Sequence, residues 1–207
     1  MHAISGQFTG RDVGAPALAG SSTRVGSGFD VTAGGVDIWD QSDQFHFVCR
    51  PVTGDFELQV RVESAELTHP YTKIGLMARA DAQADAPHFL QWVFADNRAR
   101  NSNSGGYEAQ FRRVQGGACA AIYPANKDAL PPLFPVHFPN AWMRLSRKNN
   151  AFKAEASSDG ESWHTYTEME LPLPQCSLVG LAVTSHDANA STHASFRDFS
   201  FTSSNPD

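Results

Sequence analysis

The chain has 207 residues, a length that one β domain can reach undivided. Its net charge of −6 excludes the usual kind of nucleic-acid partner, because phosphate contacts require a basic surface. No stretch approaches the roughly 20 apolar residues of a membrane-spanning helix, so no membrane partner is expected. The first residues lack the charged and apolar regions of a secretory leader, which predicts either a cytoplasmic protein or a secreted one trimmed of its leader.

Period-two patterning begins early in the chain. Residues 1–34 read as short extended pieces separated by glycines. Residues 45–49 and 56–62 then alternate apolar with polar side chains, which is typical of half-buried antiparallel strands. Further strands are predicted at 71–79, 89–94 and 107–114, with a glycine- and asparagine-rich turn at 98–106.

Residues 124–139 contain five prolines. Proline cannot occupy the interior of a paired strand, so this segment is predicted to be a long irregular surface loop. Strands are expected again at 142–147, 152–156, 163–166, 179–184 and 195–201. In the last of these, Phe196, Phe199 and Phe201 cannot all face inward under strict alternation, which predicts a β-bulge near Asp198.

These elements predict the fold class. About ten to fourteen short strands with no helix favour an all-β protein, a two-sheet antiparallel β-sandwich or jelly roll. Without a linker or an internal repeat, residues 1–207 are expected to form a single domain with a surface loop at 124–139.

The three cysteines, Cys49, Cys119 and Cys176, have neither the count of a disulfide framework nor the spacing of a zinc site. Cys49 lies on the apolar face of its strand and is expected to be a buried thiol.

Catalytic signatures are missing. A hydrolase of this architecture needs paired carboxylates on one strand face, and the Glu-x-Asp-x-x-Glu pattern of laminarinase-type enzymes does not occur. The chain also lacks a Gly-x-Ser-x-Gly elbow, a His-Glu-x-x-His motif and a phosphate loop. A binding domain is therefore favoured over an enzyme.

A sugar site would combine aromatic platforms with amide, charged and imidazole groups. Residues of these types lie on or beside the predicted strands: Trp39, His46, Tyr71, Lys73, Arg79, Trp92, Gln110 and Arg112. The alternative for Arg79 and Arg112 is a ladder of cross-strand ion pairs on a solvated face. The alternative for His46 is a surface histidine bonded to a neighbouring carboxylate.

Calcium is the one metal for which the sequence offers ligands, because it prefers carboxylates and carbonyls from converging loops. Asp12 and Asp198 are candidate ligands if the terminal strands pair, and Asp37, Asp40 and Asp43 form a second cluster. Solvated turn aspartates are the alternative. No other cofactor is expected.

Several segments together resemble a known domain. They are residues 12–20, 35–39, 43–47, 54–55, 73–79, 158–163 and 179–186. Their sequence resembles the concanavalin A-like jelly-roll domain of lectins and glucanases, a group that includes laminin-G-like domains. Residues 37–79 are also similar to the regulator-of-enolase family, a bacterial family of largely unknown function. Cys49, where an aromatic is common, and the loop at 124–139 depart from the usual pattern.

The resemblance implies two face-to-face sheets with a glycan bound on the concave face or its rim, in some relatives with calcium. The first functional hypothesis is therefore a non-catalytic carbohydrate-binding domain. The second is an intracellular protein-interaction or regulatory domain of the regulator-of-enolase type. The third is a glycosidase or polysaccharide lyase with unrecognised catalytic residues.

Overall fold

A computed structural model describes residues 7–95 and 104–204 of the chain, and all its regular elements are strands. The first sheet has the order β1 (Thr9–Val13), β6 (Phe45–Thr53), β15 (Cys176–Thr184), β8 (Lys73–Arg79), β9 (His88–Phe94), β10 (Tyr107–Arg112) and β11 (Cys119–Ile122). The second has the order β14 (His164–Glu170), β13 (Ala151–Ser157), β12 (Ala141–Lys148), β7 (Phe56–Ala65), β16 (Asp187–Ser203), β3 (Gly28–Gly35) and β2 (Ser21–Val25). A hairpin of β4 (Ile38–Trp39) and β5 (Ser42–Asp43) completes the set.

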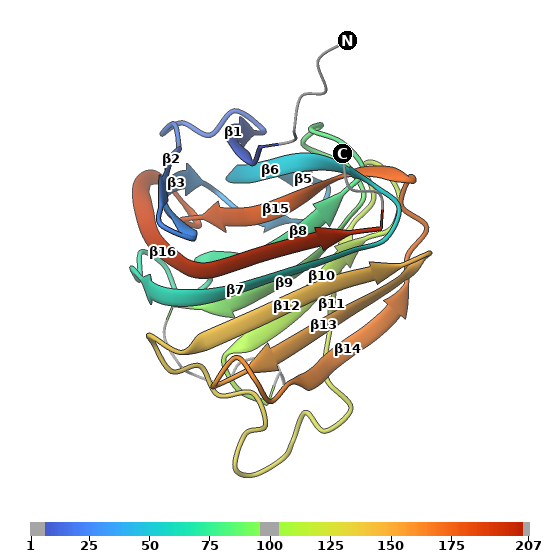
Figure 1. Cartoon of the computed structure of the whole chain (residues 1–207). Helices are drawn as coiled ribbons and strands as arrows, with labels where there is room; N and C mark the ends of the chain where they lie inside the picture. The colour runs from blue at the N-terminus through green and yellow to red at the C-terminus, as the bar shows by residue number, and fades with distance from the viewer. Residues whose placement is uncertain (1–6, 96–103, 205–207) are drawn as a thin grey trace.

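The two sheets lie face to face, with the second in front of the first in Figure 1. Every ladder is antiparallel, which confirms the predicted sandwich. The main core lies between the sheets and includes Leu58, Val60 and Val62 of β7 opposite Ile74 and Leu76 of β8. Because side chains alternate along a strand, the apolar residues of β7 can all face this core.

A second apolar cluster covers the other face of the first sheet, here called the outer face. It contains Phe45, Phe47, Cys49, Met77 and Trp92 together with Ile38 of the small hairpin. All residues of β8 and β9 are consequently buried. Residues 45–49 of β6 are buried on both faces as well, although their alternation predicted a strand buried on one face only. Cys49 is a buried free thiol, as expected, and burial raises its pKa to about 11.

Two local predictions are confirmed. The register of β16 against β7 shifts between Arg197 and Ser200, and Asp198 has a φ of 53°, so a bulge lies where one was expected. Phe196 can therefore enter the core while Phe199 and Phe201 pack against it. The segment 124–139 contains no strand, as its prolines predicted.

Within the described residues there is no helix long and apolar enough to cross a membrane. Residues 98–103 of the predicted turn at 98–106 lie outside the described part of the chain.

Candidate functional site

The segment 36–44, which contains the β4–β5 hairpin, lies on the outer face of the first sheet. Gly35 has a φ of +115°, a conformation that side chains other than glycine rarely adopt, and this turns the chain onto the face. The Thr184 hydroxyl lies 3.0 Å from the carbonyl oxygen of Gly35 and 2.9 Å from that of Gln44. One side chain of β15 therefore holds both ends of the segment.

Asp43 links the segment to two strands below it. Its carboxylate accepts hydrogen bonds from Arg112 at 2.7 and 2.8 Å and from Arg79 at 3.1 Å, and all three side chains are fully buried. Burial lowers the pKa of Arg79. Burial also acts to lower that of Arg112, but the hydrogen bond and charge of Asp43 raise it overall. The hairpin is thus fixed to β8 and β10 by a buried ion-pair cluster.

Four of the proposed sugar contacts are consequently buried rather than on a solvated face, and His46 and Lys73 are buried as well. Arg79 and Arg112 hold Asp43, Gln110 donates to the carbonyl of Ile38 at 2.6 Å, and Trp92 is 1% exposed. The ion pairs predicted as an alternative do exist, but inside the molecule, because the segment 36–44 excludes water from this part of the face.

Asp37, Trp39, Tyr71, Lys73 and Glu108 lie at one end of the outer face, and we call them the open-end group. Tyr71 is exposed, Asp37 and Trp39 are half-buried, and Lys73 and Glu108 are buried. The Lys73 ammonium pairs with the Asp37 carboxylate and lies 5.9 Å from the centre of the Trp39 ring. It also lies 4.9 Å from the centre of the Trp92 ring beneath. These distances are within the range of cation–π attraction.

Asp37 has a second partner in His186, whose Nε2 lies 3.1 Å from the carboxylate. Burial alone would raise the pKa of Asp37, but the hydrogen bonds and charges of His186 and Lys73 hold it below its ordinary value. His186 stacks on His69 with ring centres 4.3 Å apart, and Tyr71, 38% exposed, lies at 5.8 Å from His186. The exposed rim of the group is therefore aromatic and its floor is charged.

Glu108 is the least satisfied member. Its side chain is buried, and Oε2 has no hydrogen-bond partner among the described residues. Burial raises its pKa to about 7, with the Asp37 charge adding to the effect and Lys73 opposing it. Glu108 faces Trp92 directly across the β9–β10 ladder, and the Trp92 indole nitrogen also lacks a partner. Buried polar groups are normally hydrogen-bonded, so two exceptions on facing residues mark a place for a missing partner.

The structure brings together Trp39, Tyr71 and Lys73 but separates His46 from them. His46 Nδ1 lies 2.8 Å from Asp12 and its Nε2 lies 3.4 Å from the hydroxyl of Ser22, between β6 and β2. His46 is thus bonded to a carboxylate, as the alternative interpretation predicted. It is buried, however, whereas the prediction placed it on the surface.

Asp12 and Asp198 do not share a site. β1 pairs with β6 in the first sheet and β16 lies in the second, so the pairing of terminal strands on which the calcium prediction depended does not occur. Asp198 accepts from Arg61 at 2.6 Å. Each carboxylate already has its own partner.

Among the described residues, one cluster has metal-ligand types within reach of each other: Asp43, His88 and Cys119, with ligand atoms within 4.8 Å. It does not fit calcium, which takes six to eight oxygen ligands. Both Asp43 oxygens are bound by arginines, burial lowers the pKa of His88 to about 3, and burial raises the pKa of Cys119 to about 12. The Asp43 carboxylate is therefore occupied by the arginines and is not free to bind a metal.

Sequence reasoning missed Glu108 as a functional residue, although it alternates with Gln110 and Arg112 on the same strand face. Asp37 was assigned only to a candidate calcium cluster. The signal for both was positional: Glu108 shares a face with residues already selected, and Asp37 directly precedes the Ile38–Trp39 strand.

No protein-family model matches the sequence, and no curated protein matches it. A functionally unknown protein from Saccharomyces cerevisiae has a similar structure, with 16% identity and a TM-score of 0.66 over 94% of this chain and 96% of that one. The exoplasmic/lumenal domain of VIP36, in its Ca²⁺/Man3GlcNAc-bound form, has 10% identity and a TM-score of 0.51 over 100% and 90%. The GH43 protein BlXynB from Bacillus licheniformis has 9% identity and a TM-score of 0.60 over 85% of this chain and 33% of that one.

At these identities the comparisons show the fold, while the similarity to the regulator-of-enolase family stays a prediction from the sequence. The chain has two antiparallel seven-stranded sheets packed face to face, and these structures match it along almost its whole length. It therefore has the concanavalin A-like jelly-roll fold.

Proposed function

We propose that this chain is a non-catalytic carbohydrate-binding domain that recognises a glycan at the open-end group of the outer face. Half-buried Trp39 and exposed Tyr71 supply flat apolar surfaces for the C–H faces of a sugar ring. Lys73, Asp37 and Glu108 supply charged and neutral partners for its hydroxyls. Aromatic walls with a few convergent polar groups are the usual make-up of a small-molecule site.

The observation that carries the proposal is a pair of unpartnered buried atoms on two residues that face each other across the β9–β10 ladder, the carboxyl oxygen of Glu108 and the indole nitrogen of Trp92. An unsatisfied buried polar group costs about 1–3 kcal/mol. A sugar hydroxyl can accept a hydrogen bond from the Trp92 indole N–H or from a protonated Glu108. It can also donate one to a Glu108 oxygen, so one sugar would satisfy both groups. The VIP36 domain, whose structure is similar, is in a form bound to Man3GlcNAc.

A thermal-shift screen of simple sugars and soluble polysaccharides, each with and without calcium, tests the proposal. A ligand at 100 times its Kd adds roughly 2.7 kcal/mol of stability, which is a readable shift. A sugar-dependent shift is expected. A shift with calcium alone would indicate a structural metal instead, and no shift with any glycan would contradict the proposal and favour a protein partner.

A second candidate is a glycosidase or polysaccharide lyase, because the two carboxyl groups of the open-end group differ in pKa. That of Asp37 is held below its ordinary value and that of Glu108 is raised to about 7. Such a pair suits an ionised base and a neutral acid. Release of reducing ends or unsaturated products by the wild type but not by Glu108→Gln would establish it; flat activity across β-glucans, alginates and pectins would eliminate it.

A further inference from the structure

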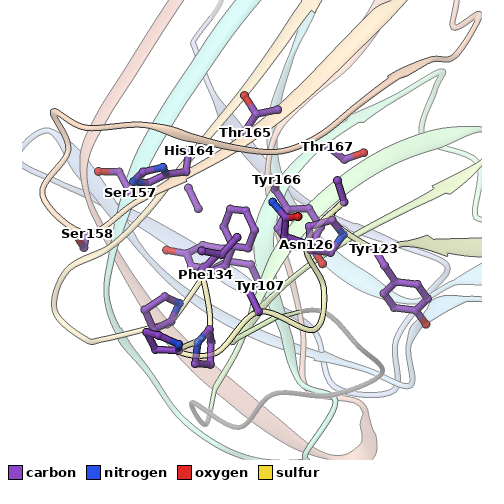
Figure 2. Close-up of a pocket in the computed structure, with 18 of the residues that line it drawn as sticks. Tyr107, Tyr123, Asn126, Phe134, Ser157, Ser158, His164, Thr165, Tyr166 and Thr167 are labelled. Atoms are coloured by element: carbon purple, nitrogen blue, oxygen red, sulfur yellow. The ribbon is translucent and has the colours of Figure 1, made fainter.

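A separate half-open pocket lies at the end of the sandwich, between the proline-rich loop, the edge strand β14 and its neighbour β13. Its volume is about 930 Å³, within the range of ordinary ligand pockets. Figure 2 shows the rings of Tyr107, Phe134 and Tyr166 gathered in its interior. None of the open-end group lines this pocket.

The interior of the pocket is largely apolar. Phe134 and Tyr166 meet edge to face with ring centres 4.9 Å apart, and both are buried. Pro124, Pro131, Pro132 and Pro135 add rigid apolar surface, and Leu130 and Leu133 are 92% and 46% exposed on the loop. Exposed apolar surface beside a pocket often marks a ligand-binding site, and a bound ring compound would cover these leucines.

One polar atom inside lacks a partner. The Tyr107 hydroxyl donates to the carbonyl of Trp142 at 3.0 Å, and the Ser157 hydroxyl lies 2.8 Å from Asp159 within its own turn. The Tyr166 hydroxyl is buried and, of the described lining groups, it alone is buried without a hydrogen bond. Burial raises the pKa of Tyr166, and the charge of Glu108 adds to this, so the hydroxyl keeps its proton and can donate.

The remaining polar groups limit the ligand chemistry. Among the described residues, no lysine or arginine lines the pocket. Besides the tyrosines, the ionisable side chains that line it are His164 and Glu168, and both are exposed. The described lining therefore offers an anionic ligand no buried cation. In Figure 2, Thr165 and Thr167 point away from the three rings. A sugar would bury several hydroxyls against prolines with few partners, each at a cost of about 1–3 kcal/mol.

We propose that this pocket binds an uncharged, mainly apolar ring compound with one hydrogen-bond acceptor, a carbonyl or ether oxygen that accepts from the Tyr166 hydroxyl. Such a ligand matches the aromatic interior, needs no charge partner and satisfies the one orphaned donor. The pocket shares no lining residue with the open-end group, where the glycan is proposed to bind.

Acetophenone, an aromatic ring with one carbonyl, is a suitable probe. Titration of the full chain followed by heteronuclear NMR should shift the signals of Tyr107, Phe134 and Tyr166. Toluene lacks the acceptor, benzoate adds a negative charge, and methyl β-glucoside replaces the apolar ring with hydroxyls. Acetophenone is expected to bind more tightly than all three.

Tyr166→Phe removes only the donor. It should weaken acetophenone binding about 3–10-fold and leave toluene binding unchanged. The variant is expected to fold at least as stably as the wild type, because it loses an unsatisfied buried hydroxyl. A Tyr166→Phe variant that folds and binds acetophenone as well as the wild type would overturn the proposal.

A second pair of variants tests the location without touching the core. Leu133→Ser, on the loop, should weaken acetophenone binding about threefold or more, because it removes apolar contact surface. Leu67→Ser is the matched control, since Leu67 is 50% exposed but lies outside the pocket. Equal effects of the two variants, tighter binding of methyl β-glucoside, or no signal shift at millimolar probe would each refute the assignment.

Discussion

Asp43 shows how one carboxylate can determine the surroundings of a site without belonging to it. It is fully buried, accepts from two arginines of different strands, and fixes the segment that covers the outer face. The sequence marked the same residue only as a member of a candidate calcium cluster. Its partners, Arg79 and Arg112, are 36 and 69 residues away, so local pattern could not reveal their contact.

Asp43→Ala should destabilise the protein by about 3–5 kcal/mol, because it leaves two buried guanidinium groups without their counter-charge. Urea unfolding measures the loss, and failure to obtain folded protein counts as the same outcome. Asp128→Ala is the control: Asp128 pairs with Lys127 on the surface and is 76% exposed, so its loss should cost less than about 1 kcal/mol. Similar costs for both variants would contradict the buried-cluster account.

Glu108 should make stability depend on pH. Its pKa is about 7 in the folded chain against 4.5 for an ordinary glutamate, so between these values the folded state holds a proton that the unfolded state has lost. The free energy of unfolding should therefore fall as pH rises from about 4.5 to 7, by roughly 3 kcal/mol, and then level off.

Glutamine mimics the protonated acid, so Glu108→Gln should abolish this part of the decline. Urea midpoints at pH 5 and pH 8 for wild type, Glu108→Gln and the exposed control Glu57→Gln measure the difference. If wild type and Glu108→Gln decline equally, Glu108 is ionised at an ordinary pH and the proposed neutral partner for a sugar hydroxyl is lost.

At the scale of elements, the segment 36–44 decides which side chains meet solvent. Alternation predicted most of the strands because period two is a local property of the sequence, and the bulge at Asp198 followed from three phenylalanines. The hairpin folds over the outer face because Thr184 binds Gly35 and Gln44 and because Asp43 binds Arg112. These contacts join residues that are far apart in the sequence, so local patterns do not predict them. For this reason Arg79, Trp92, Gln110 and Arg112 were expected at the surface.

Gly35→Ala should dislodge this segment. A Cβ at position 35 would lie 2.1 Å from the carbonyl oxygen of Gln44, and the φ of +115° is itself strained for alanine. We expect a cost of about 3 kcal/mol or more. Gly26→Ala separates the two causes, because Gly26 also has a positive φ but its Cβ would meet nothing within 4 Å; its cost should be about 1–2 kcal/mol.

Unfolding in urea gives both costs, and near-ultraviolet circular dichroism reports whether the tryptophans, Trp39 among them, keep their packed environment. Equal losses for the two alanine variants would mean that the approach of Gly35 to Gln44 contributes nothing.

For the whole molecule, the two-sheet sandwich could be predicted because turn residues and alternation recur along the chain. The site was less predictable: Trp39, Tyr71 and Lys73 were selected by type and do come together, whereas Glu108 gains its character only from burial beside Trp92. The pocket beneath the proline-rich loop depends on how that loop packs against β14, which composition does not encode.

The most direct test of the central claim compares two tryptophans on opposite sides of the sandwich. Trp39 lies 5.9 Å from the Lys73 ammonium at the open-end group, and Trp163 stacks 4.3 Å from Arg144 of the second sheet. Isothermal titration of the best glycan from the thermal-shift screen should show binding weakened at least tenfold by Trp39→Ala, as the loss of about 1.4 kcal/mol of stacking requires. Trp163→Ala should bind like the wild type; unchanged affinity in Trp39→Ala, or equal losses in both variants, would contradict a glycan site at the open-end group.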